Sequence, residues 1–513
     1  MTMNSLCEEA ESFLRVAPQF QLGALTTEQP HPKTCELSGM ARQDLGAAVG
    51  VLKEVDLDAL GMLGEYAETL EPLAVAIEET VSSGGRVFLA GCGATGRLSI
   101  SLEVFAREGF FGRELRESVV GFMAGGDAAL VRSIERFEDY PEYGARQLRE
   151  LGFRDGDLMV ATTEGGETPF VIGAVEEAAR VSGRRPFFLY CNPDEILCRV
   201  AERSRRVIEN GAIEKVNLTV GPMAVTGSTR MQASTVLMAA VGWAMACRSE
   251  PWRIGEKAGE FRDWVEETGW EFLAELVRFE EEVYEAGGGV LYEPNGYGMT
   301  VLTDTTERSP TFSLAPFENV RDEGGKRSWC YLHVKGAGDA GEAWRRLLGR
   351  EPRTLEWEEV RGLAGGERLT GFDFSDGYAV RREGVSVHER IVIEDRLEAI
   401  EIRAGERSFE VTAAGRDLFS RHLMLKLILN AHSTLLMGRL GRYEGNVMTW
   451  VQASNNKLID RAIRYVRILL EERGDEVPEY EEVARVLFEV RSEMGSDEAV
   501  VTKVVEAMEM AGV

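Results

Sequence analysis

A glycine-rich loop between an apolar run and a helix is the feature of this sequence best suited to chemistry. Residues 87–90 are apolar, Gly91-Cys-Gly-Ala-Thr-Gly-Arg97 follows, and helix-forming residues continue from about Arg97. Free backbone N–H groups at such a helix start, together with the positive end of the helix dipole, bind anions. A plain strand-to-helix turn would use the same glycines. The candidate phosphate ligands are Gly93, Ala94, Thr95, Gly96 and Arg97.

Polar, glycine-containing loops follow three other apolar runs. They are Ala124-Gly-Gly-Asp127, Ala161-Thr-Thr-Glu-Gly-Gly-Glu-Thr-Pro169 and Val225-Thr-Gly-Ser-Thr-Arg-Met231. Loops at the carboxyl ends of parallel strands gather at one edge of the sheet and bind ligands there. Each loop alone is more simply structural, but the set predicts a site of sugar-phosphate size. The further candidate ligands are Thr163, Glu164, Gly165, Gly166, Thr168 and Ser228.

The first loop also matches the glycine spacing of dinucleotide-binding proteins. That fingerprint needs an acidic residue at the end of the second strand, where it binds a ribose. No acidic residue closes the second strand at that place, and Ala124-Gly-Gly-Asp127 continues as a further loop of the expected sugar site. The sequence therefore disfavours a dehydrogenase, and no cofactor is expected.

The elements that would position these loops alternate between apolar runs and helical segments from residue 86 to residue 243. The expected strands are residues 87–90, 119–124, 158–161, 186–190 and 216–220. This alternation is typical of a parallel sheet covered by helices on both faces. Acidic helices are expected at 255–286, a second αβ region at about 290–440, and helices at the C-terminal end. Residues 25–34 contain two prolines and predict an extended arm.

Composition indicates several domains and excludes some functions. With 513 residues and 44% hydrophobic content, about two to four domains are expected, and no apolar run is long enough to cross a membrane. A net charge of −28 disfavours a general nucleic-acid binder. The seven cysteines and five histidines lack zinc or disulfide spacing, and the N-terminus lacks a signal-peptide pattern. We therefore expect a reduced, cytoplasmic protein without a metal.

A larger set of motifs makes the chain recognisable. They are Leu25-Thr-Thr-Glu-Gln29, Gly91-Cys-Gly-Ala-Thr-Gly-Arg97, Ala124-Gly-Gly126, Glu138-Asp139, Thr168-Pro169, Thr226-Gly-Ser-Thr-Arg230, Lys426-Leu-Ile-Leu-Asn430, Ser433-Thr434, Gly445-Asn-Val-Met448 and Val451-Gln-Ala-Ser-Asn-Asn-Lys-Leu458. In combination they resemble the sugar isomerase (SIS) family, especially N-acetylmuramic acid 6-phosphate etherases and the glucokinase regulatory protein. The resemblance covers most of the chain and is patchy between about 320 and 410.

The resemblance implies two SIS copies in one chain, because an etherase has one SIS domain and this chain is longer by about one such domain. Val290-Leu-Tyr-Glu-Pro-Asn-Gly-Tyr-Gly298 would be the strand and loop of a diverged second copy that has lost its phosphate ligands. The implied fold is α/β, with two flavodoxin-like αβα sandwiches with parallel sheets, packed as an intrachain pseudo-dimer, plus a C-terminal helical cap. The expected divisions are an N-terminal arm (1–60), a first SIS domain (61–255), a helical connector (256–286), a second SIS domain (287–445) and the cap (446–513).

The same resemblance implies catalytic residues divided between the copies. Asp304-Thr-Thr-Glu-Arg-Ser-Pro-Thr311 matches the family's Asp-x-x-Glu-x-x-Pro-Thr context, with Glu307 as the catalytic glutamate. Glu138 matches the second family glutamate and Lys426 the family lysine. One complete site and one dead site would result, and independent drift of both copies is the alternative. The counterparts that have lost these functions are Phe105, Gly338 and Met238.

The implied activity is a lyase that cleaves the lactyl ether of a phosphosugar such as N-acetylmuramic acid 6-phosphate. A proton is removed next to an open-chain aldehyde and another is delivered to the departing ether oxygen, which suits two carboxylates, one with a raised pKa. Glu307 and Glu138 would fill these roles, in either order, and Lys426 would orient a carboxylate or sugar oxygen. The alternative function is a non-catalytic sugar-phosphate sensor with a protein partner.

Two of these residues also have simpler structural explanations, and one loop departs from the family pattern. Glu138 could cap a helix, and the Lys426 side chain could snorkel from an apolar helix. Where etherases carry a Ser-Gly-Arg-type loop, this chain has Glu164-Gly-Gly-Glu167. Two carboxylates there would weaken anion binding by about 1 kcal/mol each, unless backbone amides compensate or the ligand is less anionic than a phosphate monoester.

Overall fold

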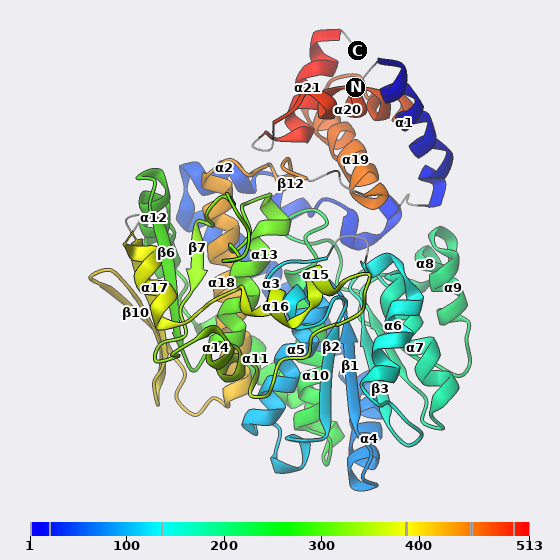
Figure 1. The fold of residues 1–513 in the computed structure, drawn as a ribbon, viewed down its shortest axis with the longest axis vertical. Helices are drawn as coiled ribbons and strands as arrows, with labels where there is room; N and C mark the ends of the chain where they lie inside the picture. Colours follow the sequence, from blue (N-terminus) through cyan, green and yellow to red (C-terminus); the bar gives the residue numbers. More distant parts are fainter. Residues whose placement is uncertain are drawn as a thin grey trace.

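The computed structural model describes residues 3–19, 22–134, 137–384, 388–451, 453, 455–495 and 498–511. Within these residues the strands form two five-stranded sheets and one two-stranded ribbon (Figure 1). Helices surround the sheets, and a separate group of helices forms a cap at the end of the molecule that carries both termini.

The first sheet is entirely parallel, with the strand order β2-β1-β3-β4-β5. This is the flavodoxin-like order, in which ligands bind outside the carboxyl ends of β1 and β3. The strands are β1 (Val87–Gly91), β2 (Val119–Met123), β3 (Leu158–Thr162), β4 (Phe187–Tyr190) and β5 (Glu214–Asn217). The helices around it are α4 (Ala67–Ser82), α5 (Gly93–Glu108), α6 (Pro141–Glu150), α7 (Pro169–Val181), α8 (Asp194–Val200), α9 (Glu202–Ile208) and α10 (Gln232–Ala246).

Alternate side chains along each strand pack into two separate hydrophobic cores, because successive residues of a strand point to opposite faces of the sheet. Phe88 and Met159 pack with Phe170 of α7 on one face. Val87 and Leu158 pack on the other face, in the core that α4, α5 and α10 share with the second sheet. Both faces are buried, which explains why the strands are continuous apolar runs rather than alternating ones.

The first four strands lie within a residue of their expected bounds, and β5 differs. Residues 216–220 were expected to be a strand, whereas β5 covers Glu214–Asn217. The Asn217 side chain accepts a hydrogen bond from the Thr219 backbone N–H at 3.0 Å. The Leu218 N–H still bonds to the Tyr190 carbonyl of β4 at 2.7 Å, and the local bond of Asn217 begins the turn that follows the strand.

The second sheet is mixed, with the order β10-β9-β8-β6-β7. Its strands β7, β6 and β8 are parallel, and β9 and β10 add an antiparallel hairpin. The three parallel strands repeat the order of β2, β1 and β3, and the expected parallel sheet is thus present for three strands. The strands are β6 (Gly289–Asn295), β7 (Cys330–Leu332), β8 (His388–Asp395), β9 (Ala399–Ala404) and β10 (Arg407–Thr412), and the helices are α13 (Gly298–Phe312), α14 (Ala340–Leu348), α15 (Arg361–Ala364), α16 (Gly366–Thr370), α17 (Asp376–Glu383) and α18 (Leu418–Arg439).

Long helices join the two sheets into one core. The helix α5, which follows β1, packs against α13, which follows β6, and α10 packs against α18. Nearly all of α18 between Phe419 and Gly438 is buried, as expected for a helix surrounded on all sides. The remaining helices of this layer are α2 (Leu37–Gln43), α3 (Leu45–Glu65), α11 (Ile254–Glu267) and α12 (Phe272–Glu285).

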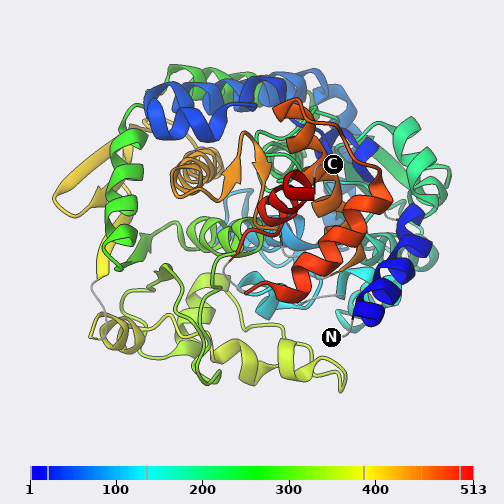
Figure 2. The same ribbon diagram turned by 90° about the horizontal axis from the view of Figure 1, so that it is seen from above.

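The cap contains the N-terminal helix as well as the C-terminal ones. The helix α1 (Met3–Val16) packs on α20 (Tyr480–Glu493), and α19 (Asn456–Arg473) and α21 (Val500–Ala511) complete the group (Figure 2). A ribbon of β11 (Tyr443–Glu444) and β12 (Val447–Met448) precedes it.

The segment at residues 25–34 is not the extended arm that its prolines suggested. It forms short 3₁₀ turns at Thr26–Glu28 and Pro32–Thr34. The Glu28 carboxylate is buried and pairs with Arg461 and Arg464 of α19. The segment therefore joins the first sheet to the cap, and its polar side chains are satisfied by partners far along the chain.

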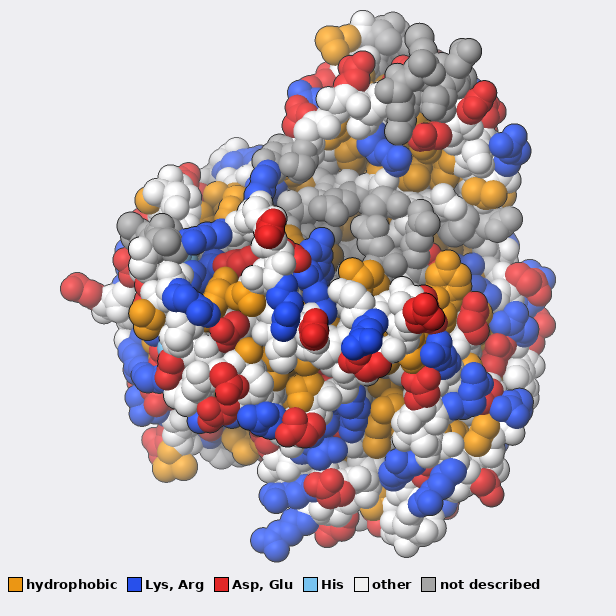
Figure 3. All heavy atoms as spheres, in the orientation of Figure 1, with side chains coloured by type: hydrophobic (Ala, Val, Ile, Leu, Met, Phe, Trp, Pro, Cys, Tyr) orange, Lys and Arg blue, Asp and Glu red, His pale blue; other side chains and the backbone are white. Residues whose placement is uncertain are grey.

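The surface view in Figure 3 shows Lys and Arg side chains interspersed with Asp and Glu over this face of the molecule. The net charge of −28 is therefore not gathered into one acidic patch on this face. Among the described residues, no helix combines the length and the apolar character needed to span a membrane.

Candidate functional site

The glycine loop after β1 adopts the strand–turn–helix geometry expected of an anion site. The helix α5 begins at Gly93, which has a φ of +55°, four residues earlier than the sequence suggested. Gly91 approaches the backbone of the next turn so closely that a Cβ there would lie 2.3 Å from the Thr95 carbonyl carbon. Glycine is thus required at both positions by the path of the backbone.

Thr95 stabilises this loop from within. Its hydroxyl accepts a hydrogen bond from the Cys92 N–H at 3.1 Å and donates to the Cys92 carbonyl at 3.0 Å. The Thr95 side chain is buried, so its hydroxyl proton is not free for a phosphate, contrary to the role expected from the sequence. The donors left at the loop are the amides of the first turn of α5, including Gly93 and Ala94.

The loop after β3 lies at the same edge of the sheet. Thr163 and Thr168 share a hydrogen bond of 3.0 Å across this loop. The carbonyls of Gly165 and Gly166 accept hydrogen bonds from Asn192 and Ser204, which fixes the turn. Since β1 and β3 are neighbours, this loop and the loop at 91–97 flank the crevice at which such sheets bind ligands.

The carboxylates of Glu164 and Glu167 have opposite environments. Glu167 forms ion pairs with Arg203 and with Lys457 of α19. Although burial alone would raise it, these two cations lower the pKa of Glu167 to about 2. Burial raises the pKa of Glu164 to about 7, and Ser234 donates a hydrogen bond to its carboxyl group at 2.8 Å. The repulsion expected from the sequence is thus reduced, because one carboxylate is neutralised by cations and the other is partly protonated near neutral pH.

Ser228 and Glu138 lie in two further loops. The Ser228 hydroxyl is buried and has no hydrogen-bond partner within the described parts of the chain. The Cys92 thiol donates a hydrogen bond of 3.3 Å to Glu138 Oε2, so Glu138 lies directly beside the glycine loop. Burial raises the pKa of Cys92 well above its usual value, which keeps the thiol protonated in this contact.

Arg97 connects the first loop to the second sheet region. Its guanidinium forms an ion pair with Glu307 of α13, and Nε lies 3.2 Å from the Leu130 carbonyl. Arg97 is 2% exposed and the Glu307 side chain is 12% exposed. Arg97 Nη2 has no hydrogen-bond partner in the described structure. A buried guanidinium with an unused donor is a ready ligand for an anionic oxygen.

Four segments of the chain line a cavity of about 40 Å³ beside this ion pair. The lining residues repeat at helical spacings of three and four, which places them on one face of each helix. A single water molecule requires about 10–15 Å³ of such a cavity. The cavity therefore has room for a few waters and not for a hexose phosphate. The lining residues are Ala94, Arg97, Leu98 and Ser101 of α5; Arg230, Ser234 and Met238 in or just before α10; Thr300, Thr303, Asp304 and Glu307 of α13; and Lys426 and Asn430 of α18.

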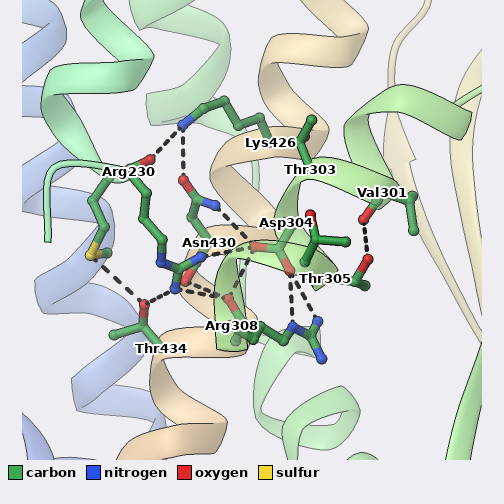
Figure 4. A network of polar contacts seen from close by, with 12 residues as sticks. Arg230, Val301, Thr303, Asp304, Thr305, Arg308, Lys426, Asn430 and Thr434 are labelled. Atoms are coloured by element: carbon green, nitrogen blue, oxygen red, sulfur yellow. Dashed lines mark hydrogen bonds and ion pairs between the residues drawn. The ribbon is translucent and has the colours of Figure 1, made fainter. Parts of the chain in front are cut away.

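Asp304 anchors α13 in this arrangement (Figure 4). Its Oδ1 accepts hydrogen bonds from Arg230 at 3.2 Å and from Asn430 at 3.0 Å, and Oδ2 pairs with Arg308 at 3.1 Å. Burial opposes its charge, but the two arginines lower the pKa of Asp304 below its usual value. This network fixes the rotation of α13 and therefore the side of the helix on which Glu307 lies.

Lys426 is partly buried and lines the same cavity. Its ammonium donates hydrogen bonds to Asn430 Oδ1 at 2.9 Å and to the Arg230 carbonyl at 3.1 Å (Figure 4). A third hydrogen bond, of 2.7 Å, goes to Thr235 Oγ1. Burial lowers the pKa of Lys426 to about 8. Three protein groups hold its ammonium, so the structure differs from the snorkelling alternative.

The counterpart region around the second loop is filled by rings. Phe105 of α5 and Tyr297 of the second loop both pack on His422, with ring centroids 4.4 and 4.7 Å away. Burial lowers the pKa of His422 to about 3, so it stays uncharged. Gly338 is exposed and does not line the cavity of Arg97 and Glu307. The Tyr297 hydroxyl donates a hydrogen bond of 2.7 Å to Asp395, which pairs with Arg421 at 2.9 Å, so the charges near this loop are engaged with each other.

Sequence reasoning did not select several residues that the fold brings to the cavity. Arg230, Ser234, Asp304 and Asn430 were not among the candidate ligands, although three of them stand in motifs that the sequence displayed. Asn430 is four residues from Lys426 on α18, so helical spacing from this chosen residue would have found it.

One part of the chain matches a known family. Residues 70–179, which include β1, the glycine loop and β2, match the family described as glucokinase regulatory protein N-terminal SIS domain. This part of the chain is therefore similar to a SIS domain, as the motifs indicated.

The chain is also similar in sequence to several N-acetylmuramic acid 6-phosphate etherases. The enzyme of Rhodopirellula baltica is 32% identical over 215 residues, which are 42% of this chain and 66% of the relative. That of Bacillus subtilis is 30% identical over 217 residues, 42% of this chain and 65% of the relative. The chain thus spans less than two thirds of the length of either relative. Among solved structures, the tagatose-6-phosphate ketose/aldose isomerase of Escherichia coli aligns with 13% identity and a TM-score of 0.39, over 78% of this chain and 95% of its own.

Proposed function

We propose that this protein binds a phosphosugar in one composite site per chain and cleaves its lactyl ether, as the named relatives do. The observation that carries the proposal is the contact of Arg97, in the first glycine loop, with Glu307 of α13. It brings a group suited to phosphate and a group suited to acid–base chemistry to one cavity. The loop amides at 93–97, Ser228 and the 163–168 loop would hold the phosphosugar.

The chemistry is an elimination that needs no redox partner. Glu307 takes the proton from the carbon next to the open-chain aldehyde, a carbon–carbon double bond forms, and the lactyl ether bond breaks. Glu138 gives a proton to the departing ether oxygen, and water then adds to the double bond. Lys426 lies at the same cavity and would orient a sugar oxygen. The two glutamates could exchange roles.

The ion pair must open for this reaction. In the structure Arg97 engages a Glu307 oxygen, and the cavity is too small for the sugar. A ligand phosphate would replace Glu307 as the partner of Arg97, and the freed carboxylate would face the sugar. Binding energy from the phosphate is thereby used to assemble the catalytic group, a form of induced fit.

A sugar-phosphate sensor is the second candidate. It is favoured by the match of residues 70–179 to the regulatory-protein SIS domain. In that case the same displacement of Glu307 would alter the packing of α13 and signal to a protein partner without turnover.

The test is calorimetric titration of the full chain with N-acetylmuramic acid 6-phosphate, followed by detection of released lactate. One ligand per chain with lactate release supports the lyase, and one ligand without lactate supports the sensor. Two ligands per chain, or none, would contradict the composite site under either function.

A further inference from the structure

A second hollow lies on the outer edge of the first sheet, away from the cavity of Arg97 and Glu307. Its volume is about 230 Å³, and it lies between the edge strand β2, the helix α6 and residues 353–355 of the connection between β7 and β8. The two cavities share no lining residue. In Figure 1 the chain that carries α15 and α16 crosses in front of β2 and β1.

The edge strand turns unused hydrogen-bond donors toward this hollow. In a parallel strand both polar groups of a residue point to the same side, and sides alternate. Ser118 and Ala124 bond to β1 through the contacts Val87 N–H to Ser118 O and Ala124 N–H to Gly91 O. The backbone polar groups of the odd-numbered residues between them therefore point away from β1. The contacts to two of their carbonyls confirm this. Arg353 donates to the Gly121 carbonyl and Gln147 to the Met123 carbonyl, each at 3.0 Å.

The outward N–H groups of Gly121 and Met123 have no hydrogen-bond partner among the described residues. Residues 353–355 do not continue the ladder of β2: the Arg353 carbonyl accepts from the Asp127 N–H, beyond the end of the strand, and Arg353 reaches β2 through its side chain. Buried backbone donors are almost always satisfied by protein, water or a ligand. The hollow is therefore lined by backbone hydrogen-bond donors that lack an acceptor.

An unused acceptor faces the same space. Gln147 of α6 is 4% exposed and lines the hollow. Its amide nitrogen is used by the Met123 carbonyl, but Oε1 has no partner in the described structure. Leaving such a group unsatisfied is costly, and its presence in a hollow of this size points to an occupant.

The charged groups of the lining are already paired with each other or with neighbours. Asp127 holds Arg350 at 2.6 Å, and Arg353 holds Glu103 at 2.7 Å. Glu150 accepts from the Trp357 indole N–H at 2.7 Å. No unpaired cation among these residues is available for a phosphate, so an occupant is expected to be uncharged.

We propose that this hollow is a binding site for an uncharged polyhydroxyl molecule of about monosaccharide size. Hydroxyl groups both accept and donate, so one molecule can accept from Gly121 and Met123, about 7 Å apart along the strand, and donate to Gln147 Oε1. The site is distinct from the proposed phosphosugar site and stands independently of the proposed activity. Arg350 and Arg353 also form ion pairs with Glu103 of α5. The occupant would therefore lie at a contact between the second sheet region and the first.

The experiment titrates the full chain with glucose and with myo-inositol by saturation-transfer NMR and calorimetry, with glucose 6-phosphate as the charged probe. Gln147→Met removes the acceptor while keeping the side-chain shape, and Thr354→Phe fills the hollow from the exposed side. Each should weaken binding of the uncharged probe about tenfold or more. Lys426→Met, at the other cavity, is the control and should leave this binding unchanged.

Two results would overturn the proposal. One is absence of binding of both uncharged probes to the unaltered chain at millimolar concentration, with water as the occupant in a crystal structure. The other is binding that Lys426→Met abolishes while both hollow variants retain it, which would assign the uncharged sugar to the first cavity. Circular dichroism of each variant checks that the fold is intact, and Thr354→Phe decides the outcome if Gln147→Met does not fold.

Discussion

Arg97 and Glu307 are 210 residues apart in the sequence and form a largely buried ion pair between the first turns of α5 and the middle of α13. Arg97 Nε also lies 3.3 Å from Thr306 Oγ1, so two contacts of one arginine join the glycine loop to the helix that carries the proposed catalytic glutamate. Arg97 and Glu307 also line the same cavity. The contribution of this ion pair to stability and its opening on ligand binding can be tested separately.

The first prediction concerns stability. Arg97→Met leaves the Glu307 carboxylate without its partner, so the free energy of unfolding should fall by about 3 kcal/mol. The double variant Arg97→Met/Glu307→Gln should recover at least about 1 kcal/mol, because the uncompensated charge is gone. Urea unfolding of the four proteins of this cycle measures the coupling. Strict additivity would mean that the two side chains do not interact in solution.

The second prediction concerns catalysis. Glu307→Gln should abolish lactate release while largely sparing phosphosugar affinity, since the amide keeps the shape but cannot take a proton. Glu281→Gln is a matched control, because Glu281 is a glutamate that pairs with Arg439 away from the cavity. Initial rates and calorimetry are the measurements. Full turnover in Glu307→Gln would remove this residue from the mechanism.

A third prediction uses the pH dependence of stability at Glu164. Its pKa is raised to about 7 in the folded protein against an ordinary value of 4.5, so the native state holds a proton that the unfolded chain has lost. Stability from this group is full below pH 4.5 and falls by about 3 kcal/mol as pH rises to 7. Glu164→Gln should remove this loss. Urea unfolding at pH 5 and pH 8 measures it, and an unchanged pH slope would contradict the burial effect.

Glu167 should behave with the opposite sign. Its folded pKa of about 2 lies below the ordinary 4.5, so its contribution is present above pH 4.5 and is lost as pH falls toward 2. Glu167→Gln should therefore destabilise the protein by about 3 kcal/mol at neutral pH and have little effect near pH 2. Unfolding monitored by fluorescence at both pH values tests this. A similar cost at both would indicate loss of packing rather than of the ion pairs with Arg203 and Lys457.

The last prediction concerns the loop itself. A Cβ at Gly96 would lie 2.6 Å from the Met123 Cβ, so Gly96→Val must shift the helix start and misplace the amides of residues 93–97. Phosphosugar affinity should fall about tenfold or more. The control is Gly211→Ala, where a Cβ meets nothing within 4 Å. Equal affinity in calorimetry for Gly96→Val, with the fold intact by circular dichroism, would mean that the ligand lies elsewhere.

The sequence was sufficient for features that depend on local pattern. Apolar runs buried on both faces predicted the strands of the first sheet, because hydrophobicity and glycine position are properties of consecutive residues. The glycine spacing of 91–96 predicted the strand–turn–helix, and its resemblance to the SIS family is borne out by the match of residues 70–179. The bounds of β5 were wrong, because an apolar run does not fix where an edge strand leaves its sheet.

The tertiary structure alone decided which distant groups meet. The hydroxyl of Thr95 is used within its own loop, and the charge of Glu167 is compensated by Arg203 and by Lys457 of the cap. The pairing of Arg97 with Glu307 depends on the packing of α5 against α13, which is set by two sheets and a shared core. Burial and long-range electrostatics depend on distances in space, and a sequence states only distances along the chain.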